Sequence, residues 1–248
     1  MSDERAREES VTSEGERFDR YATDYATTIN NERGMGLTGE SFEYYLDLRL
    51  TMVRTLLAEE TGRPPASIID FGCGAGDTQV HLRRCFPDAR LIGIDASAES
   101  VRVARERRLE NVEFCVSDGL RFPVQDASVA VSYSNGTFHH VEHADHLEIA
   151  RELYRVTEPG GHAFMFENNG LNPVVAWLMD HNEVDRGARR VSHWKLRRTF
   201  AKAGFRIRAV RFYAFFPKLL EPLRKRESAI GWLPFGAQYL VWGQKPRA

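Results

Sequence analysis

Residues 70–76, with the sequence DFGCGAG, decide the fold of this chain. The apolar run 66–69 precedes them and a helix-like segment, 77–86, follows. A strand, a glycine turn and a helix form the front half of a nucleotide-binding βαβ unit, because glycines permit a tight turn that aims helix N–H groups at a ligand. The spacing excludes a dinucleotide site, since Asp77 and Gln79 stand where a third glycine is required, and no Lys-Ser/Thr pair marks a phosphate loop.

Strand-like and helix-like segments alternate along the rest of the chain, which implies a parallel sheet with right-handed crossovers. Two helices, Arg17 to Asn30 and Ser41 to Glu60, are expected before the first strand because apolar residues recur there at helical spacing. A further helix is expected over Ser192–Ala203, ended by Gly204. The expected strands after residues 66–69 are 90–95, 111–116, 126–133, 162–167, 205–215 and 237–244.

Length and composition favour one intracellular domain. A chain of 248 residues is long enough to bury its own core. The three cysteines, Cys73, Cys85 and Cys115, are odd in number and lack C-x-x-C spacing, which predicts a cytoplasmic location and neither a disulfide frame nor a zinc site. No signal peptide is recognisable, and no apolar run approaches the ~18 residues that a membrane span needs.

Together these motifs resemble the class I S-adenosylmethionine (SAM)-dependent methyltransferases. Their first motif, an acid followed by G-x-G-x-G, is matched by Asp70, Gly72, Gly74 and Gly76, and RELYRVTEPGGHAFMFE at 151–167 is similar to their fourth helix and fifth strand. The resemblance covers roughly residues 65–245. It implies an α/β, Rossmann-like three-layer sandwich whose seven-stranded, mostly parallel sheet has the order 3-2-1-4-5-7-6. It also implies SAM as cofactor and S-adenosylhomocysteine as product.

The cofactor contacts are expected at the ends of the first four strands and in the N-terminal helices. A carboxylate about 20 residues past the glycine turn accepts hydrogen bonds from ribose hydroxyls, and Asp95 fits; its alternative role, capping the next helix, suits Ser97 better. The resemblance assigns adenine contacts to Asp118 and Gly119, although Asp-Gly is also a common turn. The full expected set is Asp70, Gly72, Gly74, Gly76, Asp95, Ala96, Asp118, Gly119, Ser134, Tyr21, Tyr25 and Arg49.

The chain is expected to divide into a frayed tail, a helical cap and a catalytic domain. The resemblance implies that the cap forms a lid over the cofactor, with Tyr21, Tyr25 and Arg49 as candidates for its methionyl carboxylate; the alternative is that the tyrosines are a packing face. Aromatic residues among polar ones suggest two substrate-side elements. The expected boundaries are 1–16 for the tail, 17–62 for the cap, 63–248 for the SAM-binding domain, and 168–191 and 212–236 for the substrate side.

Two histidines follow the fourth strand, at the edge where open α/β folds bind ligands. A hydroxyl acceptor must lose a proton, and histidine is the usual base near neutral pH. The hypothesis is that His140 is the base and Glu167 its partner, with His139 the second candidate; alternatively both histidines only shape the pocket. His143 and His146 continue the helical spacing, but without a cysteine or carboxylate pattern no metal is expected.

The expected reaction is methyl transfer to a hydroxyl of a small molecule, such as a sugar, a natural product or a lipid-linked intermediate. No Asn/Asp-Pro-Pro-aromatic motif follows the fourth strand, so a nucleobase amine is not the expected acceptor. Residues 181–230 hold 14 Lys/Arg against 4 Asp/Glu. This asymmetry allows three readings: a solvated face, an anionic or glycan acceptor with peripheral membrane contact, or a docking surface for RNA or protein. Besides a small-molecule methyltransferase and an RNA- or protein-directed methyltransferase, a third possible function is SAM binding without catalysis.

Overall fold

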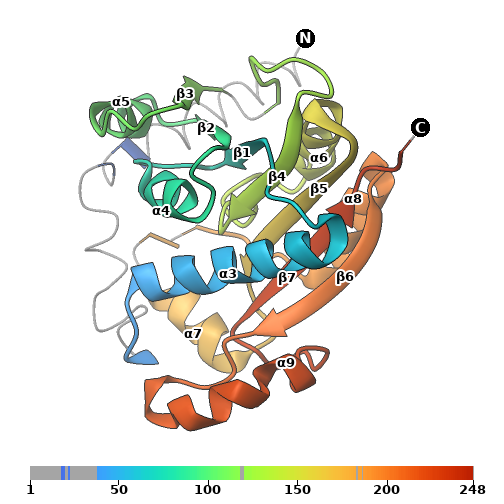
Figure 1. The fold of residues 1–248 in the computed structure, drawn as a ribbon. Coiled ribbons are helices and arrows are strands. Elements are labelled where there is room, and N and C mark those ends of the chain that lie inside the picture. The colour runs from blue at the N-terminus through green and yellow to red at the C-terminus, as the bar shows by residue number, and fades with distance from the viewer. Residues whose placement is uncertain are drawn as a thin grey trace.

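The structure is a computed structural model that describes residues 18–19, 22, 38–117, 120–182, 184–185 and 187–247. Helices cover both faces of one twisted sheet, with α3 lying across one of them (Figure 1). The elements are, in chain order, α3 (Phe42–Thr61), β1 (Ser67–Phe71), α4 (Asp77–Cys85), β2 (Arg90–Asp95), α5 (Ala98–Glu106), β3 (Val112–Val116), β4 (Val129–Asn135), α6 (His146–Val156), β5 (Thr157–Asn168), α7 (Pro173–His181), α8 (His193–Ala203), β6 (Arg206–Tyr213), the 3₁₀ segment η2 (Lys218–Arg226), α9 (Glu227–Ile230) and β7 (Gln238–Gln244).

The sheet has seven strands in the order β3-β2-β1-β4-β5-β7-β6. The pairs from β3 to β5 are parallel, whereas β7 runs antiparallel to both of its neighbours. The α/β class and the strand order expected from the resemblance are therefore confirmed. Because β7 is reversed, its first residue, Gln238, pairs with the last residue of β5, Asn168.

Two cores hold the layers together, one on each face of the sheet. On one face Leu50 of α3 and Leu82 of α4 pack in the same cluster as Ile68. On the other, Leu153 of α6 and Phe200 of α8 share a cluster with Ile69. Adjacent residues of β1 thus enter opposite cores, as expected for a central strand buried on both sides. Each such side chain contributes roughly 1.5–3 kcal/mol of burial free energy.

Helix boundaries follow capping residues that are visible in the sequence. The Ser41 Oγ accepts a hydrogen bond from the backbone N–H of Tyr44 at 3.3 Å, and α3 ends at Gly62, whose φ is 66°. In α8, Ser192 caps the start and Gly204, with φ of 114°, ends the helix. Serine caps satisfy free N–H groups, and glycine adopts the left-handed turn that closes a helix.

Two strands start three or more residues away from the predicted position. The strand β5 begins at Thr157 rather than at residue 162, because Gly160 adopts a φ of 84° and its N–H donates to the Lys245 carbonyl at 2.9 Å. Gly160 and Gly161 therefore lie within a paired strand. The strand β4 starts at Val129 instead of 126, since Ala127 has a positive φ of 51°. The expected tail 1–16 and most of the helix 17–30 lie outside the described residues.

Candidate functional site

The glycine turn between β1 and α4 has three left-handed residues with different surroundings. Gly72, Gly74 and Gly76 have φ of 80°, 52° and 83°. A Cβ on Gly72 would lie 2.1 Å from Thr137 Oγ1, whereas a Cβ on Gly74 would meet nothing within 4 Å. The first glycine thus permits internal packing, and Gly74 borders open space where a ligand can approach. The third, Gly76, begins α4, whose N–H groups favour a negative group nearby.

Asp95, at the end of β2, is held beside this turn by backbone donors. Its Oδ2 accepts the N–H of Gly74 at 2.7 Å and its Oδ1 accepts the N–H of Ser97 at 2.9 Å. Burial raises the pKa of Asp95, and these donors oppose the rise. The α5 cap is Ser97, whose Oγ accepts the N–H of Ser100, so the capping role does not fall to Asp95. The exposed Ala96 lies between them.

Three buried polar atoms near the turn have no hydrogen-bond partner among the described residues: Asp70 Oδ1, Tyr133 Oη and Arg49 Nη1. Their residues are 1%, 0% and 2% exposed. Burial raises the pKa of Asp70 to about 7, although Gln79 donates to its other oxygen at 2.7 Å. Burial also raises the pKa of Tyr133, with Arg49 lowering it and Asp70 raising it, so the acid and the cation both lie near this hydroxyl. An unsatisfied acid and an unsatisfied cation around one hydroxyl suit a zwitterionic ligand.

Arg49 is positioned by residues from distant parts of the chain. Its Nε donates to Tyr213 Oη at 3.1 Å and its Nη2 donates to Gln238 Oε1 at 2.8 Å. These bonds tie α3 to the ends of β6 and β7 and fix the guanidinium plane. Within the described part of the chain Nη1 has no hydrogen-bond partner, so it is available to bind a further group.

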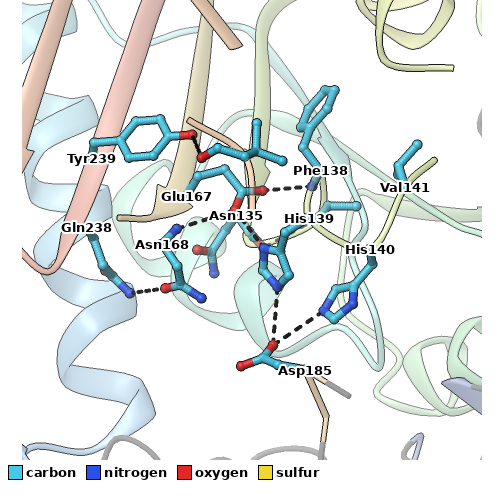
Figure 2. Close-up of polar contacts among 12 residues, drawn as sticks. Asn135, Phe138, His139, His140, Val141, Glu167, Asn168, Asp185, Gln238 and Tyr239 are labelled. Atoms are coloured by element: carbon cyan, nitrogen blue, oxygen red, sulfur yellow. Dashed lines mark hydrogen bonds and ion pairs between the residues drawn. The ribbon is translucent and has the colours of Figure 1, made fainter. Parts of the chain in front are cut away.

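Glu167, His139 and Asp185 form a buried chain of polar contacts at the ends of β4 and β5 (Figure 2). Glu167 Oε1 accepts the N–H of Phe138 at 2.7 Å, and its Oε2 lies 2.6 Å from His139 Nδ1. On the other side of the ring, His139 Nε2 lies 3.3 Å from Asp185 Oδ1. His140 Nε2 also faces this carboxylate oxygen, at 3.7 Å.

The pairing of His140 with Glu167 that the sequence suggests is wrong, because Glu167 pairs with His139. The reason is the turn after β4: the N–H of Phe138 donates to Glu167, so the next side chain projects toward the same carboxylate. The following ring, His140, lies beyond it against Asp185 (Figure 2).

The two flanking carboxylates determine the charge of His139. Burial by itself lowers the pKa of this imidazole, but the carboxylates of Glu167 and Asp185 outweigh burial and raise the pKa to about 10. His139 is therefore an imidazolium at neutral pH in this structure, and an imidazolium cannot accept a proton. The same cation stabilises the two buried carboxylates beside it.

A pocket of about 120 Å³ opens at this edge of the sheet. Its apolar wall comes from α3 and α7, and its polar wall comes from the ends of β4 and β5 and the start of β7. Six of its lining residues belong to the segment 168–191 expected on the substrate side, and none belongs to 212–236. The lining residues are Thr38, Phe42, Tyr45, Arg49, Asn135, Gly136, His139, Asn168, Val175, Leu178, Met179, Asn182, Asp185, Ala237 and Gln238.

Other expected site residues lie elsewhere. Ser134 is buried in β4, and its Oγ has no hydrogen-bond partner among the described residues. His146 is buried, with Nε2 2.9 Å from the Phe138 carbonyl, so it supports the turn rather than lining the pocket. The structure gives His143 no role in the pocket. Four expected contacts lie outside the described residues: Tyr21, Tyr25, Asp118 and Gly119.

Two residues of the N-terminal segment reach across the glycine turn. Asp19 Oδ1 accepts a hydrogen bond from Ser97 Oγ at 2.5 Å, at the end of β2. The ring of Phe18 meets the ring of His140 edge to face, with centroids 4.8 Å apart, just after β4. Because β1 lies between β2 and β4, this segment crosses the place where a ligand of the turn would lie.

The sequence reasoning missed Tyr133, Asn135, Asp185 and Gln238. Asp185 lies 46 residues from His139, and Gln238 lies 189 residues from Arg49, so no local spacing connects them. The positions of Tyr133 and Asn135 are predictable from the sequence, because both lie at the carboxyl end of the fourth strand, where ligands bind in this class of sheet.

The comparisons with known proteins agree with this geometry. A methyltransferase domain model matches residues 68–161. Trans-aconitate 2-methyltransferase of Azoarcus sp. (strain BH72) is 35% identical over 117 residues, 47% of this chain and 45% of the relative. The enzyme of the same name from Deinococcus radiodurans is 30% identical over 124 residues, 49% of this chain and 45% of the relative. The matches therefore span less than half the length of these curated relatives.

Solved structures show the same fold. A chain from the complex between the Haloferax volcanii Trm112 methyltransferase activator and a methyltransferase has a TM-score of 0.63 and 23% identity, covering 93% of this chain and 98% of its own. Geranyl diphosphate C-methyltransferase from Streptomyces coelicolor A3(2) has a TM-score of 0.57 and 19% identity, covering 79% of this chain and 78% of its own. The glycine turn and the strand order agree with the domain model: residues 68–161 are similar to a methyltransferase domain, and the whole sheet has the fold of the solved methyltransferases.

Proposed function

We propose that this chain transfers the methyl group of SAM to an oxygen of a small acceptor, with a hydroxyl as the expected acceptor. One observation carries the proposal: the glycine turn and the pocket that holds His139 and Asp185 open at the same edge of the sheet. A cofactor on the turn would thus face an acceptor in the pocket. The trans-aconitate 2-methyltransferases support a small, acidic acceptor.

The residues around the turn fit SAM. Its methionyl end carries an ammonium and a carboxylate, and the unsatisfied atoms of Asp70, Tyr133 and Arg49 offer an acid, a hydroxyl and a cation to them. The open side of Gly74 leaves room for the nucleoside, and Asp95 keeps lone pairs for ribose hydroxyls. When bound, SAM supplies a methyl group on a positively charged sulfur.

Positioning accounts for most of the expected rate enhancement, because displacement at a methyl group needs alignment and a dry site more than covalent help. The apolar wall formed by Phe42, Val175 and Met179 excludes water, while the Asn168 amide, held by a hydrogen bond from Gln238 Nε2, offers its NH₂ group to orient the acceptor. His140 remains the candidate base for the acceptor proton, since its ring faces the Asp185 carboxylate, which stabilises the cation that forms.

A docking surface for RNA is the weaker alternative. Several basic side chains of 181–230 are neutralised by carboxylates outside that segment. Four arginines form such ion pairs: Arg189 with Glu142, Arg190 with Asp180, Arg208 with Glu60 and Arg224 with Glu40. Neutralised arginines contribute less to the binding of a polyanion.

A lipid-linked acceptor is supported by a second observation. Exposed apolar side chains gather along η2 and the loop after α9, where Leu219 is 91%, Trp232 73% and Phe235 68% exposed. Lys225 and Arg226 stand in the same segment. Apolar side chains among cations suit an anionic membrane surface. Of the described helices, none has the length and hydropathy for a membrane span.

Radiolabelled SAM tests the proposed reaction. The purified chain is incubated with labelled SAM and separate fractions of small acids, hydroxylated metabolites, lipid extract and RNA, and S-adenosylhomocysteine is quantified. We expect label in a small-molecule or lipid fraction, and a loss of turnover in His140→Ala with SAM affinity nearly unchanged. An exposed histidine gives the matched control, His181→Ala. Label in RNA alone, or SAM binding with no transfer to any fraction, contradicts the proposal.

A further inference from the structure

Beyond the methyl-transfer proposal, His139, His140 and Asp185 converge on one point beside the pocket, which His139 and Asp185 line. His139 Nε2 lies 3.3 Å and His140 Nε2 3.7 Å from Asp185 Oδ1, and one ligand atom of each residue lies within 4.8 Å of the others. Figure 2 shows both rings directed at this carboxylate. We propose that these three side chains bind one divalent transition-metal ion of the Zn²⁺ or Fe²⁺ class.

The spacing of the three atoms suits such an ion. Ligand atoms about 2.0–2.2 Å from a common metal lie roughly 3–4 Å apart. The cluster therefore needs only a small contraction to hold it. Two imidazoles and one carboxylate form the set in which further positions stay open for water or substrate. Imidazole favours Zn²⁺ and Fe²⁺ over Mg²⁺ and Ca²⁺, which prefer oxygen ligands alone.

Glu167 provides the support that metal-binding histidines generally have. A histidine that binds a metal through one ring nitrogen usually donates the other N–H to a carboxylate, which orients the ring. His139 Nδ1 lies 2.6 Å from Glu167 Oε2, which leaves Nε2 directed at Asp185. The carboxylate of Glu167 is itself fixed by the N–H of Phe138 at 2.7 Å. His139 is thus held in the orientation that the ion requires.

Burial and charge favour a cation at this point. The side chains of His139, His140 and Asp185 are 4%, 10% and 12% exposed, and that of Glu167 is 1% exposed. A bound ion displaces the proton from His139 Nε2, and the two carboxylates of Glu167 and Asp185 beside two neutral imidazoles then carry two negative charges, which a divalent ion balances. The lining of the pocket includes His139 and Asp185, so the open coordination positions face the space assigned to the acceptor.

The role of the ion in catalysis rests on the proposed function, whereas its binding does not. A metal ion lowers the pKa of a hydroxyl bound to it, so it would take over from His140 the ionisation of the acceptor. The sequence predicts no metal site, because Asp185 lies 46 residues from His139 and no sequence motif connects the two.

Metal binding is measured first on the full, tag-free chain after chelator treatment, without SAM or acceptor. We expect calorimetry with Zn²⁺ to give one ion per chain, and affinity to fall at least about tenfold in Asp185→Asn, His140→Asn and Glu167→Gln. The exposed His181 gives the matched control, His181→Ala, which should bind as the wild type does. No binding, or equal binding by all of these variants, overturns the site.

X-ray absorption of the zinc-loaded wild type reads the ligands without any substitution, so a variant that fails to fold does not obscure the result. We expect nitrogen and oxygen at about 2.0–2.1 Å with imidazole scattering. Sulfur at about 2.3 Å, or a shell of oxygen alone, overturns the assignment. SAM binding to the chelator-treated protein, followed by calorimetry, separates the two proposals: if SAM binds and Zn²⁺ does not, only the metal site is refuted.

Discussion

At the residue scale, Asp70 is an acid whose folded environment opposes ionisation. Folding raises its pKa from 3.8 to about 7, chiefly through burial. A group with a raised pKa favours the folded state below its unfolded pKa, and this contribution is lost as the pH rises through the folded pKa. The free protein therefore becomes less stable between pH 4 and pH 7 on account of this residue.

We expect Asp70→Asn to raise the free energy of unfolding at pH 8 by up to about 4 kcal/mol, since an amide cannot ionise. At pH 4 the gain should disappear. Urea midpoints at the two pH values measure the difference, and the exposed Asp88 gives the control, Asp88→Asn, with no pH-dependent gain. An equal effect of Asp70→Asn at both pH values would show that burial does not control its ionisation. SAM affinity should fall in this variant, because the carboxylate proposed to face the SAM ammonium is lost.

Substitution by alanine should destabilise the protein more at Gly72 than at Gly74, although both glycines belong to the same turn. In Gly72→Ala the new Cβ would lie 2.1 Å from Thr137 Oγ1, so we expect a loss of about 2–4 kcal/mol in the free energy of unfolding. In Gly74→Ala the space is open and only the positive φ is strained, at about 1 kcal/mol.

Thermal melts and SAM calorimetry together check this contrast. We expect Gly74→Ala to stay folded and to lose SAM affinity, because its methyl group enters the ligand space. If Gly74→Ala binds SAM as the wild type does, this side of the turn does not face the cofactor.

At the scale of elements, η2 and the loop after α9 form the exposed apolar segment of the molecule that suits a lipid surface. We expect the chain to sediment with vesicles of anionic phospholipid and to release as salt rises, since cations near the surface contribute about 1 kcal/mol each. Leu219→Ser and Trp232→Ala should weaken this binding severalfold. Trp194, 59% exposed on α8, gives the matched control, Trp194→Ala. Equal loss in that control, or binding to neutral vesicles alone, contradicts a specific contact.

The elements themselves were largely predictable from the sequence, and their irregularities were not. The apolar runs of β1 and β2 and the caps of α3 and α8 are local signals, so the boundaries lie within a residue or two of the prediction. The start of β5 depends instead on pairing between Gly160 and Lys245, 85 residues away. No local pattern reports such a contact, and glycines on their own predict a turn.

At the scale of the whole molecule, the sequence predicts the glycine turn as a cofactor site but names only half of the residues that line the pocket. The motif of Gly72, Gly74 and Gly76 is contiguous and Asp95 follows at a fixed distance, so a local pattern predicts a role for each. The role of Arg49 is predicted only through the resemblance, and no sequence pattern predicts its hydrogen bond to Gln238. Side chains that come together only in the tertiary structure have no characteristic spacing in the sequence. For the same reason the sequence does not distinguish whether Glu167 contacts His139 or His140.

The reversed strand β7 has a consequence for synthesis of the protein. It inserts between β5 and β6, and its first residue, Gln238, holds Arg49 of the first described helix. Until β7 is synthesised, the chain lacks the strand that orients the Arg49 guanidinium. Arg49 and Gln238 both line the pocket although they lie 189 residues apart, so a stop codon before residue 238 would remove part of the pocket wall while leaving the sequence of the glycine turn intact.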